Sequence, residues 1–202
     1  MEANMDELLK NILESFENIS YVKTGEIPNI DLYMDQVTTF MDKHLRGASR
    51  NPEHDKVMTK TMINNYAKND LLPPPVKKKY SKEHMIILIF IYYFKSFLSI
   101  SDIQTLLNPI TDKLFNNDSN FKIEDLYNEV IGLEAAQIEE IKKDVIRQYE
   151  MSLDVFKDAP DEDRDFLKTF AFICAISFDL YLKQSLIEKL IDDIKNNNEE
   201  NK

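Results

Sequence analysis

Glycine and cysteine are scarce in this chain, and tryptophan is missing. The 202 residues include three glycines, one cysteine and no tryptophan. Because tight hairpins and phosphate-cradling loops depend on glycine, this scarcity argues against β-sandwiches, P-loops and dinucleotide-binding sites. A single cysteine, Cys174, cannot form an internal disulfide, which favours a reducing compartment.

Long uninterrupted apolar runs are missing too. Residues 1–20 mix acidic and apolar side chains and do not follow the order of a signal peptide. The apolar stretch 85–94 is too short to span a bilayer, and Lys168 and Asp179 interrupt the stretch 166–182. We therefore expect a cytoplasmic protein without a membrane span.

Motifs of enzymes and metal sites are not found. The histidines His44, His54 and His84 do not pair with one another at metal-ligand spacing, and Cys174 is far from them in the sequence. No nucleophile elbow, Walker or dinucleotide motif occurs. Cys174 lies among apolar residues and is predicted to be packed in a core. We expect no enzymatic activity, no catalytic residue, no metal and no cofactor.

The charge of the chain is strongly uneven. Its formal net charge is −11, yet residues 42–82 hold ten basic and four acidic side chains, a local charge of +6. The remaining residues therefore carry −17. A basic block inside an acidic protein is typical of a nucleic-acid-binding surface, although a solvated lysine-rich loop would give the same count.

Proline and helical periodicity divide the chain. The prolines at 28, 52, 73–75, 109 and 160 separate segments whose apolar residues recur every three or four positions. The predicted helices are residues 2–19, 30–45, 59–69, 82–97 and 102–107, then two long helices, about 123–156 and from 161 onward. A turn near 110–115 is left open, and at most residues 76–80 are extended. The predicted fold class is all-α.

The last helix is apolar on nearly every side in its middle. One neighbouring helix would not cover it, so the pattern indicates burial in a bundle, a dimer interface, or both. Core packing is the default interpretation of the Phe, Tyr and Met side chains of the last two helices. They could also line a pocket for a small apolar effector.

Residues 57–107 contain three blocks in a recognisable order. Thr59–Tyr66 reads TKTMINNY, Asp70–Pro74 reads DLLPP and Lys77–Ser81 reads KKKYS. These blocks resemble the recognition helix, the "GLLPP" exit and the wing end of the MerR family of bacterial regulators, and within it an uncharacterised bacterial family with a MerR-like helix-turn-helix. The resemblance implies a MerR-like DNA-binding unit with a minimal wing. We predict three parts: an N-terminal amphipathic helix (1–28), a MerR-like DNA-binding domain (29–118) and a C-terminal helical dimerisation or effector region (119–202).

The residue pattern of the expected recognition helix agrees with this resemblance. Met62, Ile63 and Tyr66 can face a core, and Thr59 can cap the start of the helix. The remaining surface and the lysine-rich turn hold residue types that contact base edges and phosphates. The predicted DNA-binding residues are Lys60, Thr61, Asn64, Asn65, Lys68, Lys77, Lys78 and Lys79.

We therefore predict a transcriptional regulator that binds double-stranded DNA as a homodimer joined by its C-terminal helices. The alternative is a helical protein-interaction module that has lost DNA binding. Asn64, which stands where the family usually has arginine, favours this alternative, whereas the three consecutive lysines argue against it.

Overall fold

The computed structural model describes residues 7, 9–14, 22–48, 56–117 and 120–200. Helices dominate this part of the chain and the only sheet in it is a small two-stranded one, which confirms the predicted all-α class. The chain forms two compact units. Unit 1 comprises residues 1–20 and 133–187, and unit 2 comprises residues 21–132 and 188–202. The division by role predicted from the sequence stays a prediction.

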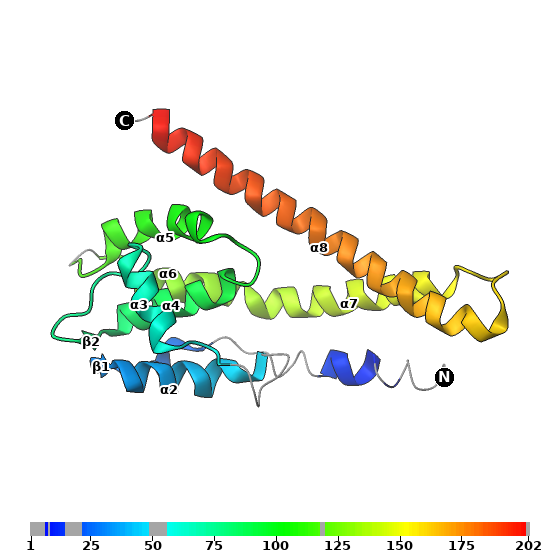
Figure 1. The fold of residues 1–202 in the computed structure, drawn as a ribbon, viewed down its shortest axis with the longest axis horizontal. Helices are drawn as coiled ribbons and strands as arrows, with labels where there is room; N and C mark the ends of the chain where they lie inside the picture. Colours follow the sequence, from blue (N-terminus) through cyan, green and yellow to red (C-terminus); the bar gives the residue numbers. More distant parts are fainter. Residues whose placement is uncertain (1–6, 8, 15–21, 49–55, 118–119, 201–202) are drawn as a thin grey trace. The chain divides into compact units, whose positions relative to one another are not determined.

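Unit 2 is built around one central helix. Its elements are η1 (Thr24–Glu26), β1 (Leu32–Tyr33), α2 (Met34–Leu45), η2 (Arg46–Ala48), α3 (Lys60–Lys68), β2 (Lys79–Tyr80), α4 (Lys82–Phe94), α5 (Ile100–Leu114) and α6 (Ile123–Gly132). In α4, every residue from His84 to Ile91 is buried, and β2, α5 and α6 all contact this helix (Figure 1). A helix that is apolar on all sides needs such cover. Residues 85–91 of the apolar run therefore form the centre of the core of unit 2.

The small sheet joins the residues just before α2 to those just before α4. β1 and β2 are antiparallel, with Leu32 opposite Tyr80 and Tyr33 opposite Lys79. A further bridge pairs Val76 with Lys79, so the chain folds back on itself in a tight hairpin just before β2. The prediction that residues 76–80 are extended is thus confirmed for the two arms of this hairpin. The two residues between the arms form its turn.

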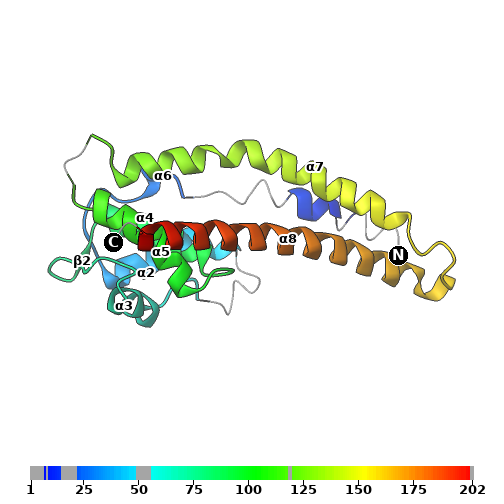
Figure 2. The same ribbon diagram turned by 90° about the horizontal axis from the view of Figure 1, so that it is seen from above.

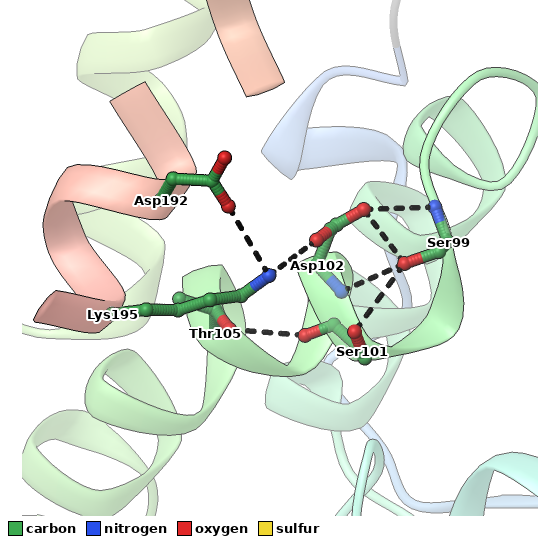
Figure 3. Close-up of polar contacts among 6 residues, drawn as sticks. All are labelled: Ser99, Ser101, Asp102, Thr105, Asp192 and Lys195. Atoms are coloured by element: carbon green, nitrogen blue, oxygen red, sulfur yellow. Dashed lines mark hydrogen bonds and ion pairs between the residues drawn. The ribbon is translucent and has the colours of Figure 1, made fainter. Parts of the chain in front are cut away.

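The C-terminal end of the last helix, α8 (Asp161–Glu200), belongs to unit 2 and is held on α5. Lys195 Nζ donates to Asp102 Oδ1 at 2.7 Å (Figure 3). The other oxygen of Asp102 accepts from the backbone N–H and hydroxyl of Ser99, the N-cap of α5. These contacts, with Lys195 first, lower the pKa of Asp102. The same carboxylate thus caps α5 and anchors α8, and nearby Ile191 is buried.

Unit 1 is a helical hairpin together with a short N-terminal helical stretch. α7 (Glu134–Leu153) and residues 161–187 of α8 are joined by residues 154–160, and the two helices lie close together near this connection and diverge away from it (Figures 1 and 2). Tyr149 and Phe172 meet edge to face, with ring centroids 5.3 Å apart. Residues 9–14 are helical, and the rest of the predicted helix 2–19, apart from residue 7, lies outside the described residues.

Several predicted helix boundaries were wrong. α2 begins at Met34 and not at residue 30, because β1 precedes it, and α4 ends at Phe94 and not at residue 97. The segment 123–156 is two helices, because Gly132, a weak helix former, ends α6 before α7 begins at Glu134. α5 runs through Pro109 to Leu114 instead of stopping before it. Proline removes one backbone hydrogen bond from a helix, and the buried Ile103 and Leu107 anchor the turns that precede it.

The predicted burial of Cys174 was also wrong, because this residue of α8 is exposed. α8 is long and apolar enough, by length and composition alone, to cross a membrane, and its most apolar window is not buried in the structure. The reason for both observations is the same. In the described chain, the half of α8 that lies in unit 1 has α7 on one side and exposes apolar side chains elsewhere.

Candidate nucleic-acid interface

The candidate interface begins with α3, whose start is fixed by a side-chain cap. Thr59 Oγ1 accepts a hydrogen bond from the backbone N–H of Met62 at 3.2 Å, which confirms the predicted N-cap. Ile63 and Tyr66 are buried, and Met62 is half-buried. α3 is therefore attached to unit 2 by a single stripe, and its other side faces solvent.

The five residues predicted on the open side of α3 are all exposed: Lys60, Thr61, Asn64, Asn65 and Lys68. They extend over the whole length of the helix, and α3 contains no acidic residue. Two cations, two amides and a hydroxyl thus share one solvent-facing surface. These are groups that bind phosphates and base edges in the major groove.

The exit of α3 has an unusual backbone at Asp70. Its φ is 52°, in the left-handed region that favours glycine. The N–H of the next residue, Leu71, bonds back to the carbonyl of Tyr66 at 2.9 Å, which closes the helix end. Asp70 occupies the position of glycine in the exit motif that the sequence resembles. Asp70 thus adopts a backbone conformation that glycine would adopt without strain.

The lysine-rich turn is the tip of the hairpin and is strained. Lys77 and Lys78 have φ values of 51° and 64°, and both side chains are exposed. Val76 and Lys79 exchange two backbone hydrogen bonds across them, of 3.1 and 2.9 Å. This is a two-residue turn of the type I′ class, for which Asn-Gly is the preferred sequence. Two lysines instead occupy backbone positions that are unfavourable for them.

The start of α2 lies between α3 and the hairpin. Lys60 of α3 forms an ion pair with Asp35 in the first turn of α2. Lys79 lies over the ring of Tyr33, the N-cap of α2, with its Nζ 5.1 Å from the ring centroid. α2 contacts both α3 and β2. The structure therefore brings Lys60 and Lys79 to the same end of α2, whereas Lys68 lies at the far end of α3.

A polar groove of about 480 Å³ runs between α2 and the start of α3. Its lining includes three cationic side chains, of Arg46, Lys56 and Lys60. Asp42 holds Arg46 by hydrogen bonds from the guanidinium, one of them 3.0 Å long. Neither Arg46 nor Lys56 was among the predicted binding residues. Their membership of the basic block 42–82 was the signal that pointed to them.

Behind the hairpin, His84 is buried between aromatic rings. It lies edge to face with Tyr80 and Phe115, at centroid distances of 5.5 and 4.7 Å. Its Nδ1 accepts from the backbone N–H of Ser81 at 3.0 Å, which caps α4. Burial lowers the pKa of the imidazole, although the nearby carbonyls of Pro73 and Pro74 oppose this shift. His84 is therefore a neutral structural group beneath the hairpin.

These features define an all-α protein with a helix pair, α2 and α3, followed by a tight basic hairpin. In the described residues, no three His, Cys, Asp or Glu side chains cluster in a way that could hold a metal ion. The chain belongs to the family described as Domain of unknown function (DUF1836), whose model matches residues 22–130, more than half of the chain. No curated protein and no solved structure matches it.

Proposed function

We propose that the protein is a transcriptional regulator that binds double-stranded DNA through α3 and the hairpin at Lys77–Lys78. The observation that carries this proposal is the hairpin tip, where two exposed lysines are held at positive φ. Left-handed backbone costs a non-glycine residue roughly 1–2 kcal/mol. Backbone strain of this kind concentrates at functional sites, where the strained residues are retained because their side chains are needed for function.

The open face of α3 supports the same proposal. In this view Asn64, Asn65 and Thr61 meet base edges in the major groove, while Lys60 and Lys68 contact phosphates. The hairpin lysines add phosphate contacts next to the start of α2. The resemblance of residues 57–107 to a MerR-type helix-turn-helix and wing supports the same assignment of roles. Such a role involves no catalysis, and it would place the protein in the cytoplasm, where bacterial DNA lies.

The uneven charge would orient the complex. The basic block of +6 lies in a chain whose other residues carry −17. Phosphates are therefore attracted at this block and repelled by most of the remaining surface. This arrangement favours one docking orientation over many weak ones.

The salt dependence of DNA binding tests the proposal. We would measure the fluorescence anisotropy of a labelled random-sequence duplex over a range of salt concentrations. If Lys60, Lys68, Lys77 and Lys78 each contact a phosphate, log affinity falls with log salt with a slope of about −3.6, at about −0.9 per contact. The variant Lys77→Gln/Lys78→Gln should lower the affinity and reduce the slope by about 1.8.

A matched control removes an equal charge from unit 1. Lys142 and Lys143 are also adjacent lysines, and each pairs with a glutamate on α7. Lys142→Gln/Lys143→Gln should leave both affinity and slope unchanged. If the two double variants weaken DNA binding equally, the electrostatic attraction between protein and DNA does not depend on the hairpin lysines in particular. A wild-type protein that does not bind DNA would favour the alternative of a helical protein-interaction module.

A further inference from the structure

The half of α8 that lies in unit 1 has a second apolar face, turned by about a third of a helical turn from the residue that contacts α7. Phe172 faces α7, where it meets Tyr149. Away from this contact, successive steps of four and three residues connect five exposed positions: Phe166, Phe170, Ile173, Ser177 and Leu180. An average step of 3.5 residues is the spacing of a seam that packs along another helix.

The size of this face matches a protein interface. Phe166 is 70% exposed and Tyr181, on the flank of the seam, is 65% exposed. An aromatic side chain offers about 150–250 Å² for burial, so Phe166, Phe170 and Tyr181 together leave roughly 350 Å² uncovered. The half-exposed aliphatic residues between them bring the total towards the roughly 800 Å² that each partner buries in a stable complex.

Charged residues make lipid a poor partner for this helix. The longest uncharged run of α8 is Thr169–Phe178, ten residues, whereas a bilayer span needs about 20. Asp179 and Lys183 follow it and form an ion pair of 2.7 Å. A membrane-spanning position would place that pair in hydrocarbon, where ionised side chains are costly.

The one polar member of the seam is suited to burial. The hydroxyl of Ser177 donates to the carbonyl of Ile173 within the same helix, at 2.7 Å. Its hydrogen is therefore satisfied without water, and a partner can cover it at little cost. The seam residues before and after Ser177 are apolar. The same seam on another helix can therefore pack against them whether the two helices are parallel or antiparallel.

We propose that this face binds α8 of a second copy of the chain, so that two α7–α8 hairpins form a four-helix bundle with the α8 seams inside. Such bundles pack seams of this spacing around a shared apolar middle. The argument uses residues of unit 1 alone and does not depend on DNA binding by unit 2. The proposal of dimerisation and the proposal of DNA binding can therefore be refuted independently of each other.

Two leucines of α8 provide a matched test. Leu180 lies on the seam and is 61% exposed, whereas Leu182 points to a different side of the helix and is 51% exposed. We would follow the self-association of the full-length protein by sedimentation velocity, without DNA, for the wild type, Leu180→Glu and Leu182→Glu. Circular dichroism would show that both variants keep their helix content, as expected for exposed positions.

The wild type should be a dimer at micromolar concentration. Leu180→Glu should weaken the dimer by at least about 100-fold, because a two-fold interface receives two buried carboxylates, and Leu182→Glu should leave it nearly unchanged. A wild type that stays monomeric overturns the proposal, and so do two variants with equal effects. A flotation assay with phosphatidylcholine–phosphatidylglycerol vesicles tests lipid binding. If the wild type floats with the vesicles and Leu180→Glu does not, the face binds a lipid surface and the dimer proposal is overturned.

Discussion

The hairpin tip offers a change that should raise stability while it weakens function. Lys77 and Lys78 adopt φ values of 51° and 64°, for which Asn-Gly is the preferred pair. The double variant Lys77→Asn/Lys78→Gly keeps the turn and removes both charges. If the two lysines are retained for DNA binding, this variant should fold more stably than the wild type and bind DNA less tightly.

The expected gain in stability can be worked out from the backbone. Removing left-handed strain at Lys78 contributes roughly 1–2 kcal/mol, and the entropy that glycine adds to the unfolded chain offsets roughly 0.5–1 kcal/mol of it. Asparagine at position 77 tolerates the left-handed region better than lysine and adds a further few tenths. The free energy of unfolding should therefore rise by about 1 kcal/mol, which corresponds to roughly 2–4 °C in Tm for a chain of this length.

Two assays on the same three proteins decide the matter. Urea unfolding followed by circular dichroism gives the stability, and anisotropy with duplex DNA gives the affinity and its salt slope. Lys77→Gln/Lys78→Gln is the comparison, since it loses the same charges without gaining a favourable turn sequence. Both variants should lose DNA affinity alike, and only Asn-Gly should gain stability. An Asn-Gly variant that is less stable than the wild type, or that binds DNA equally well, refutes the reasoning.

Two further predictions concern the surroundings of the hairpin. Asp35→Asn releases Lys60 from an exposed ion pair and should raise DNA affinity about 2- to 5-fold at low salt, measured by anisotropy; Glu139→Gln in unit 1 should have no effect, and a loss of affinity with Asp35→Asn would contradict the placement of Lys60. Because burial lowers the pKa of His84, the unfolded chain takes up its proton first, so stability is complete above about pH 6.5 and declines as the pH falls below it. His84→Gln retains an acceptor for the N–H of Ser81 and cannot titrate, so its urea midpoint should change less than that of the wild type between pH 7 and 5.5. Equal changes in the two proteins would show that His84 does not contribute.

Local pattern was sufficient to predict α3 and its exposed face. A threonine cap, an apolar stripe at helical spacing and polar residues elsewhere led to boundaries within one residue of Lys60–Lys68. α4 was placed equally well at its start, and the structure ends it at Phe94 instead of residue 97. In both helices the local signal agrees with the packing, because the stripe that the pattern marks is the one that unit 2 buries.

Features that depend on distant contacts or on backbone strain could not be predicted in this way. Sequence rules keep lysine away from positive φ, so no rule places Lys77 and Lys78 there. The approach of Asp35 to Lys60, and of Tyr33 to Lys79, joins positions far apart in the chain. The prediction for Cys174 failed for another reason. An apolar neighbourhood in sequence indicates that a helix needs cover, but it does not say whether the same chain supplies that cover.

The acidic remainder of the chain gives the salt experiment a second use. Phosphates near the basic block are attracted, while any phosphate that comes near the acidic remainder, which carries −17, is repelled. Salt screens both effects over a length of about 10 Å at 0.1 M. A short duplex that covers only α3 and the hairpin should therefore show the full slope of about −3.6. A longer duplex should show a shallower one, because salt also removes the repulsion. A slope that steepens with duplex length would place further cationic contacts outside α3 and the hairpin.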